Sequence, residues 1–310
     1  MKTVVITGAT GAIGRALIKV SIEAGYEVLT VVHRASGRAE ELKCLPHCHV
    51  LRLNLDEYDQ GLEAMKAQGI HLEDYELFFH LAWAASFGKD REKLNLQLDN
   101  VRSSLDAVRF AAALGCSTFI GAGSQAEYGR AEGVLSPDTP AFPETGYGIA
   151  KLCAGQMTRL ACEQLGLRHI WTRVLSVYGP HDRDQTLIST AVISMLRGEE
   201  TAFTPCDQMW DYIYCDDAAR AILLAGEKGT GGKVYIIGSG EVHPLRDYIE
   251  IIAHETGYTG EIGFGKRPYN DKQVMFLQAD PASLQEIGFR PQVPFEEGIR
   301  NVMRWRQSRP

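Results

Sequence analysis

An α/β fold with a doubly wound parallel sheet is the fold class that this sequence predicts. Short apolar runs rich in β-branched and aromatic residues alternate through the first 176 positions with longer segments of helical periodicity. This alternation is typical of a parallel sheet that is covered by helices on both faces. Glycines at positions 8, 11 and 14 mark the first turn from strand to helix. A looser pattern after residue 176 adds a smaller C-terminal α/β lobe.

The elements of the first part follow in order along the chain. We expect strands at 3–7, 27–33, 49–54, 76–82, 117–123 and 168–176. The first helix has Ile13, Leu17 and Val20 on one face and Gly25 as a natural stop. Two longer helices are expected near 92–114 and 146–166.

The last third of the chain has shorter elements. We expect a polar loop at 177–184, a short helix at 188–198, a turn and a helix within 210–226, a strand at 233–238, and helices near 244–256, 281–287 and 295–306. Residues 1–175 are predicted to form one domain, to which 211–238 return. Residues 176–210 and 239–310 are predicted to form the smaller lobe.

Composition excludes several classes of partner. The chain has 310 residues, of which 45% are apolar, and a net charge of −7. The sequence has no stripe of basic residues of the kind that binds nucleic acid, so nucleic acid is an unlikely partner. It also has no run of 18 apolar residues, the length that a membrane span needs. Seven scattered cysteines without a C-x-x-C motif suit a reducing cytoplasm.

One cluster of cysteine and histidine side chains could in principle bind a metal ion. Cys44, His47, Cys48 and His49 lie close together, but no second cluster completes a tetrahedral zinc set. We therefore expect a polar loop before a strand, and no metal.

The glycine turn predicts a dinucleotide site. A strand that ends in Gly8, followed by Gly11 and Gly14 at a helix start, presents free backbone N–H groups and the positive end of the helix dipole to a pyrophosphate. A side chain at Gly11 would block that approach. The first domain is therefore expected to be a Rossmann-type NAD(P)-binding domain, with the substrate bound by the smaller lobe.

The end of the second strand favours NADP(H) over NAD(H). In an NAD site, an Asp or Glu at this position hydrogen-bonds the adenine ribose. Here the chain reads Val31-Val32-His33-Arg34 and has no carboxylate before Glu40. Arg34, with Arg15 as a possible second contact, suits a 2′-phosphate. NAD(H) remains an alternative.

A proton-transfer group is predicted by Tyr147 and Lys151, which lie four residues apart on one helix face. A nearby ammonium and a positively charged nicotinamide should lower the pKa of the phenol. Ser124 follows a central strand, at the edge where open α/β sheets bind ligands. The three residues together predict hydride transfer coupled to proton transfer at a carbinol or carbonyl.

The whole set of motifs resembles the extended short-chain dehydrogenase/reductases. Within them, the sequence is similar to the nucleotide-sugar epimerase/dehydratase/reductase family, typified by UDP-galactose 4-epimerase. The segments that carry the resemblance include "TGATGAIG" (7–14), "YGIAK" (147–151), "RVLSVYGP" (173–180) and "WDYIYCDDAARAI" (210–222).

The resemblance implies roles by position. The catalytic residues are Ser124, Tyr147, Lys151 and Asn100, the last of which orders a helix and a proton-relay water in the family. The cofactor contacts are Gly8, Thr10, Gly11, Ala12, Ile13, Gly14, His33, Arg34, Asn54, Leu55, Leu81, Ala82, Trp83, Tyr147, Lys151 and Val174. The contacts to a nucleotide-diphosphate sugar are Trp83, Ser124, Gln125, Ser176, Arg183, Trp210 and Arg267. Trp210 replaces a common diphosphate-binding arginine, for which Arg183 or His181 could substitute.

The segment "SQAEYG" (124–129) narrows the reaction. The family's 4,6-dehydratases have acids where this chain has Gln125 and Ala126, and Glu127 should point away if the segment is extended. Dehydration is therefore disfavoured. We expect an NADP(H)-dependent reductase or dehydrogenase at C4 of a nucleotide sugar, of the 4-keto-6-deoxysugar reductase type. An NAD-dependent 4-epimerase is the first alternative and a non-catalytic NADP(H) sensor the second.

The two long helices carry apolar residues on more than one face, including Leu105, Val108, Leu152 and Leu160. Relatives pair such helices between subunits, so we expect a homodimer.

Overall fold

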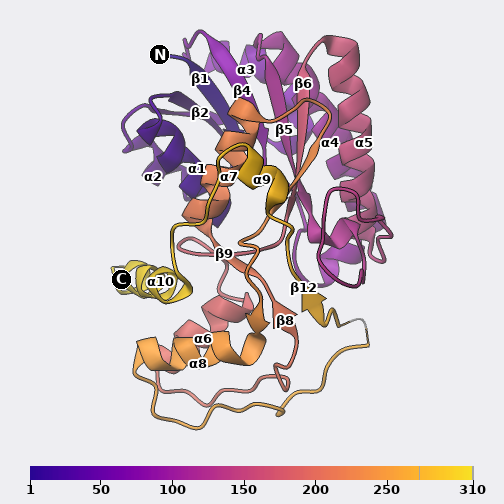
Figure 1. Ribbon diagram of the computed structural model, residues 1–310. Helices are drawn as coiled ribbons and strands as arrows, with labels where there is room; N and C mark the ends of the chain where they lie inside the picture. Colours follow the sequence, from indigo (N-terminus) through magenta and orange to yellow (C-terminus); the bar gives the residue numbers. More distant parts are fainter. Residues whose placement is uncertain (272, 309–310) are drawn as a thin grey trace.

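A seven-stranded parallel sheet forms the centre of the molecule in the computed structural model, which describes residues 1–271 and 273–308 (Figure 1). The strand order is β10-β6-β5-β4-β1-β2-β3. The strands are β1 (Thr3–Thr7), β2 (Glu27–Val32), β3 (Cys48–Arg52), β4 (Tyr75–His80), β5 (Thr118–Ser124), β6 (Arg168–Val174) and β10 (Val234–Ile237). The predicted fold class is confirmed, and each predicted strand lies within two residues of its observed bounds.

Helices cover both faces of this sheet. One layer holds α1 (Ala12–Glu23) packed against α7 (Cys215–Lys228), and the other holds α4 (Leu94–Ala113) packed against α5 (Gly146–Leu165). Side chains of a strand alternate between the two layers. In β1, Val4 and Ile6 join the core under α1 and α7, whereas Val5 joins the core under α4.

Short elements complete the sheet domain. They are α2 (Ala39–Lys43), α3 (Gly61–Ala67) and three single-turn helices, η1 (Leu55–Gln60), η2 (Gly88–Glu92) and η3 (Gln125–Glu127). None of these was predicted, because each is too short to show a helical period.

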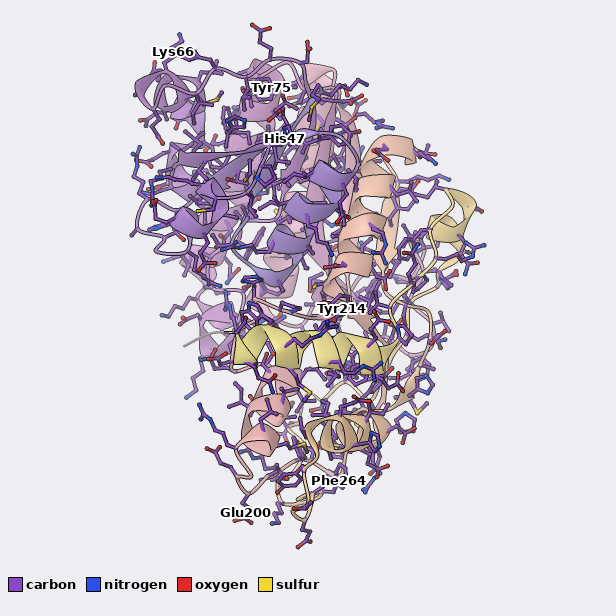
Figure 2. The ribbon with its side chains drawn as sticks, turned by 90° about the vertical axis from the view of Figure 1, so that its left-hand side faces the viewer. His47, Lys66, Tyr75, Glu200, Tyr214 and Phe264 are labelled. Atoms are coloured by element: carbon purple, nitrogen blue, oxygen red, sulfur yellow. The ribbon has the colours of Figure 1, made fainter. Side chains whose placement is uncertain are left out.

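The smaller lobe lies beyond the carboxyl ends of the strands (Figure 1). Its helices are α6 (Leu187–Leu196), α8 (Leu245–Thr256) and α10 (Phe295–Gln307), whereas α9 (Ala282–Glu286) returns to the large sheet and packs against β10. Its three-stranded sheet has the order β11 (His243–Pro244), β8 (Met209–Trp210), β12 (Phe276–Leu277). Figure 2 shows Glu200 and Phe264 at the outer end of this lobe, Tyr214 beside α10, and Lys66 at the opposite end of the molecule.

Two predicted boundaries are wrong in this region. The run 168–176 is not one strand: β6 ends at Val174, and β7 (Ser176–Tyr178) leaves the large sheet to pair with β9 (Tyr212–Tyr214). The segment 210–214 is not a turn, because its alternating aromatic residues form β8 and β9. Alternation of this kind is a strand signal.

No helix among residues 1–271 and 273–308 has the length and apolar character needed to cross a membrane.

Candidate active site

The glycine turn connects β1 to α1. Gly8 has a φ of +70°, and a Cβ there would lie 2.8 Å from the backbone nitrogen of Ala82. A Cβ on Gly14 would collide with the carbonyl oxygen of Gly8. Both glycines are therefore required by the packing of the turn itself.

Gly11 differs, because a Cβ there would meet no protein atom closer than 3.8 Å. It caps α1 without a side-chain hydrogen bond, and no acidic residue lies in the first turn of that helix. The amino end of α1 therefore keeps backbone donors and a positive dipole for an anionic ligand. This arrangement fits a dinucleotide pyrophosphate.

A cleft of about 420 Å³ opens from this turn along the carboxyl ends of the strands. The predicted residues that line it are Gly8, Thr10, Gly11, Ala12, Ile13, Gly14, Leu81, Ala82, Trp83, Ser124, Tyr147, Lys151, Val174 and Arg183. The lining also includes Arg38, Ser86, His181 and Asp182. The glycine turn and the proposed proton-transfer residues thus share one cavity.

Ser124 and Tyr147 are each placed by the start of a helical segment. Ser124 ends β5 and caps η3, with its hydroxyl accepting from the backbone N–H of Ala126 at 3.2 Å. Thr145 caps α5 by accepting from Gly148 at 3.1 Å, which sets Tyr147 in the first turn of the helix. The Tyr147 side chain is buried, with 9% of the residue exposed.

Lys151 lies one helical turn after Tyr147. Its ammonium donates to the carbonyl oxygen of Ala122 at 2.6 Å and lies 3.8 Å from the centre of the Trp83 ring. Its distance from the centre of the Tyr147 ring is 5.8 Å. Burial lowers the pKa of Lys151 to about 7, and the negative charge of Glu127 opposes this shift.

Burial also controls the ionisation of the phenol. It raises the pKa of Tyr147, whereas the Ser124 hydroxyl and the positive charges of Arg91 and Arg183 act in the opposite direction. We expected the Lys151 ammonium to lower this pKa. The protein alone shows the opposite net direction, because desolvation of the phenolate dominates and Lys151 is directed toward Ala122.

The loop after β4 is held by two buried amides of α4. Gln97 accepts from the indole N–H of Trp83 at 2.9 Å. Asn100 accepts from the N–H of Ala84 at 2.8 Å and donates to its carbonyl oxygen at 3.0 Å. Asn100 lies outside the lining of the cleft, so it positions the loop. The sequence did not identify Gln97 as a residue that holds this loop. Its position one helical turn before Asn100, on the same face of α4, could have indicated that role.

Glu127 is directed into the core. The segment 125–127 is a single helical turn and not an extended run, so the predicted reason for its direction is wrong. Its carboxylate accepts from the Ser124 N–H at 2.8 Å and from Trp171, and it pairs with Arg173 at 2.7 Å. Since Glu127 is fully buried in this network, the cleft receives no carboxylate from η3.

The arginines near the glycine turn have different partners. Arg34 pairs with Glu57 at 2.8 Å and Arg15 pairs with Glu41 at 2.5 Å. Neither lines the cleft, so their contacts to a 2′-phosphate stay a prediction. Arg38 lines it instead, and its guanidinium donates to the carbonyl oxygen of Thr10 at 3.1 Å.

Other predicted contacts also lie outside the lining. They are His33, Asn54, Leu55, Gln125, Ser176, Trp210 and Arg267. Ser176 and Trp210 satisfy each other, because the indole N–H donates to the serine hydroxyl at 2.8 Å. Asn54 caps η1 and accepts from the N–H of Arg34 at 3.1 Å. Arg267 is exposed in the loop before β12.

The Cys/His cluster at 44–49 has a local explanation. His47 and His49 lie 2.8 and 3.0 Å from the two oxygens of Glu27. In the described part of the chain, no group of three or more His, Cys, Asp or Glu side chains has the geometry of a metal site.

Comparison with known proteins places this geometry in a family. Residues 4–238 match the model of the NAD dependent epimerase/dehydratase family. A putative UDP-glucose 4-epimerase from Methanocaldococcus jannaschii is 23% identical over 98% of both chains. The dTDP-4-dehydro-6-deoxyglucose reductase of Escherichia coli is 24% identical over 97% of this chain and 96% of its own.

Solved structures agree. The UDP-glucose 4-epimerase of Thermotoga maritima, determined with UDP-glucose, superposes with a TM-score of 0.86 at 26% identity over 98% of each chain. The resemblance to extended short-chain dehydrogenase/reductases is thereby confirmed. The chain belongs to the NAD-dependent epimerase/dehydratase family and is an enzyme of its nucleotide-sugar epimerase, dehydratase and reductase group.

Proposed function

We propose that this protein is an NADP(H)-dependent oxidoreductase that reduces, or in reverse oxidises, C4 of a nucleotide-diphosphate sugar, as a 4-keto-6-deoxysugar reductase does. One observation carries the proposal. Ser124, Tyr147 and Lys151 share the cleft, and Glu127, the carboxylate nearest in sequence to Ser124, is committed to Arg173 in the core. Elimination of water needs a further acid and base, which the segment after Ser124 does not supply.

The chain's own residues account for the proton in the reaction. When bound, a reduced nicotinamide supplies the hydride that the carbonyl carbon gains. Tyr147 gives its phenolic proton to the carbonyl oxygen, and the Ser124 hydroxyl donates a hydrogen bond to the same oxygen. Lys151 holds a positive charge beside the site. In the oxidation direction, Tyr147 accepts the proton from the carbinol.

Residues at and beside the glycine turn would hold the cofactor. The backbone donors of the glycine turn and of the α1 amino end suit its pyrophosphate. Arg38 is the basic group that suits a 2′-phosphate, because it reaches the cleft while Arg34 and Arg15 are paired with carboxylates. No Asp or Glu of the segment 33–41 lines the cleft, which favours NADP(H) over NAD(H).

A 4-epimerase is the second candidate. It needs the same three residues, and two of the relatives above carry that name, one of them a solved structure with UDP-glucose. The difference between the two activities is whether the ketone leaves the site. A non-catalytic NADP(H) sensor is disfavoured by the presence of both Tyr147 and Lys151.

The test is the steady-state oxidation of NADPH with a dTDP- or CDP-linked 4-keto-6-deoxysugar. We expect turnover that is lost in Tyr147→Phe, with NADH a poorer donor. Interconversion of UDP-glucose and UDP-galactose without NADPH oxidation would overturn the reductase proposal and support the 4-epimerase. Cofactor binding without either reaction would support the sensor.

A further inference from the structure

A third basic residue reaches the reacting phenol. The guanidinium carbon of Arg91 lies 4.3 Å from the centre of the Tyr147 ring. Arg91 belongs to η2, in the loop between β4 and α4, and neither the sequence motifs nor the cleft lining pointed to it.

The position of Arg91 is fixed by contacts between η2 and α5. The carboxylate of Glu92 accepts from the N–H of Gly146 at 3.3 Å. A Cβ on Gly146 would lie 3.2 Å from the carbonyl oxygen of Arg91, so a glycine permits the close approach. The loop is therefore attached to the first turn of the helix that carries Tyr147.

Arg91 forms no ion pair with another described residue. Its buried Nε has no hydrogen-bond partner. Arg173 is a useful contrast. Its guanidinium lies 4.4 Å from the ring of Tyr128, but it is paired with the buried Glu127. The field of Arg91 therefore acts on the ring beneath it, whereas that of Arg173 is largely cancelled.

Four charged groups face Tyr147 from the elements around it. Lys151 is on its own helix, 5.8 Å from the ring centre, with its ammonium bonded to Ala122. Glu127 of η3 is paired in the core. Arg183, from the loop after β7, donates to the Ser86 hydroxyl at 3.3 Å. Arg91 lies over the face of the ring and forms no ion pair among the described residues.

We propose that Arg91 is a positioning residue for the proton transfer: its guanidinium, stacked on the face of the Tyr147 ring, fixes the ring and stabilises the phenolate that remains when the proton has left. A cation over an aromatic face is attracted to the electron-rich π system, and the attraction grows when the ring acquires a negative charge. The acid strength of Tyr147 is thus set in part by a loop outside the catalytic helix.

This inference rests on the proposed function only in its assumption that Tyr147 exchanges a proton. Its test therefore measures the ionisation of residue 147 without substrate. Tyr147 is replaced by 3,5-difluorotyrosine through nonsense suppression, since this close isostere ionises near neutral pH. Its ¹⁹F chemical shift is then followed against pH in the full-length protein with bound NADP⁺ and, separately, without it.

The variants are Arg91→Met and Arg91→Lys, with Arg246→Met as the matched control. Arg246 is stacked 4.0 Å from the ring of Phe264 in the smaller lobe, so its removal reproduces the loss of a stacked arginine away from the site. We expect Arg91→Met to raise the ionisation midpoint by about 0.5 to 1.5 pH units. Arg91→Lys keeps a positive charge and should raise the midpoint less than Arg91→Met does. Arg246→Met should leave the midpoint unchanged.

A midpoint in Arg91→Met that matches the control would overturn the inference, whatever happens to activity or thermal stability. A second readout is the pH profile of kcat/KM for oxidation of the nucleotide sugar, whose acid limb should move upward by the same amount. If the ¹⁹F midpoint moves and no oxidoreductase activity is found, the proposed function fails and the role of Arg91 stands.

Discussion

Among single residues, the three arginines that follow the glycine turn and β2 differ mainly in their partners. Arg15 and Arg34 are held by Glu41 and Glu57, whereas Arg38 reaches the cleft and is bonded to the carbonyl oxygen of Thr10. A carboxylate partner offsets the charge of an arginine and so weakens its attraction for a phosphate. Arg38 has no such partner among the ion pairs of the described residues, so we expect cofactor choice to depend on it.

We expect Arg38→Ala to weaken NADPH binding about 10-fold or more, because a hydrogen bond to a charged group contributes roughly 1.5–3 kcal/mol. NADH binding should change little. The measurement is the dissociation constant of each nucleotide by fluorescence titration. Arg34→Ala is the control and should leave the ratio of the two constants unchanged. The reverse result, with the ratio altered by Arg34→Ala alone, would restore the contact that the sequence predicted.

The sequence identified the residues whose position follows from where a strand or helix ends. Ser124 ends β5 and Tyr147 and Lys151 begin α5, and all three line the cleft as expected. It did not identify Arg38 or Arg91. Their roles depend on which neighbours hold a side chain, and Glu57 meets Arg34 only because η1 folds back beside β2. Such pairings have no periodic signal.

Between elements, the strongest polar link near the site joins η3 to β6. Glu127 and Arg173 form an ion pair whose side chains are 0% and 6% exposed. The same carboxylate bonds the backbone of Ser124, so the pair also sets the turn that presents the serine. Gly123 makes room for it, since a Cβ there would collide with the carboxylate.

Glu127→Gln should lower the free energy of unfolding by about 3–5 kcal/mol, because it leaves the charge of Arg173 buried without a counter-ion. The measurement is urea unfolding followed by circular dichroism. Glu144→Gln is the matched control, since Glu144 pairs with Arg130 where the side chains are 36% and 49% exposed. It should cost no more than about 1 kcal/mol. Equal losses in the two variants would contradict the interpretation.

The fold at the level of elements was largely predictable because long elements carry clear periods. The central strands and the helices α4, α5 and α8 all lie where the apolar pattern placed them. The strands β7, β8 and β9 were not predictable, because they have only two or three residues each. Their pairing is decided by contacts with distant segments, which a local pattern does not contain.

For the molecule as a whole, α4 and α5 present an apolar surface that nothing in the described chain covers. The large apolar residues on these helices that are 42–63% exposed are Leu94, Leu98, Ile149, Met157, Leu160 and Leu165. Of the residues that suggested this surface, Val108 is fully buried in the core, and Leu160 is 49% exposed. Large apolar side chains exposed together on two neighbouring helices suggest an interaction surface.

We therefore expect a homodimer through α4 and α5. The double variant Leu98→Glu/Leu160→Glu should shift the mass found by light scattering after size exclusion from dimer to monomer, because two buried charges per subunit would have no partner. Leu45→Glu is the control, because Leu45 is an exposed apolar residue that follows α2, a helix on the opposite side of the molecule from α5 (Figure 1). A wild-type protein that is monomeric at micromolar concentration would refute the expectation.

The path of the chain between the two parts has a consequence for how this enzyme can be altered. The chain leaves the large sheet after β6, returns for α7 and β10, and leaves again for α8 and β12. A gene fragment that stopped at residue 175 would lack both the strand beside β6 and the helix beside α1, so it would expose a bare sheet edge. We therefore expect that the smaller lobe cannot be exchanged between relatives as a separate module. A new substrate preference should instead require substitutions and loop changes within the whole chain.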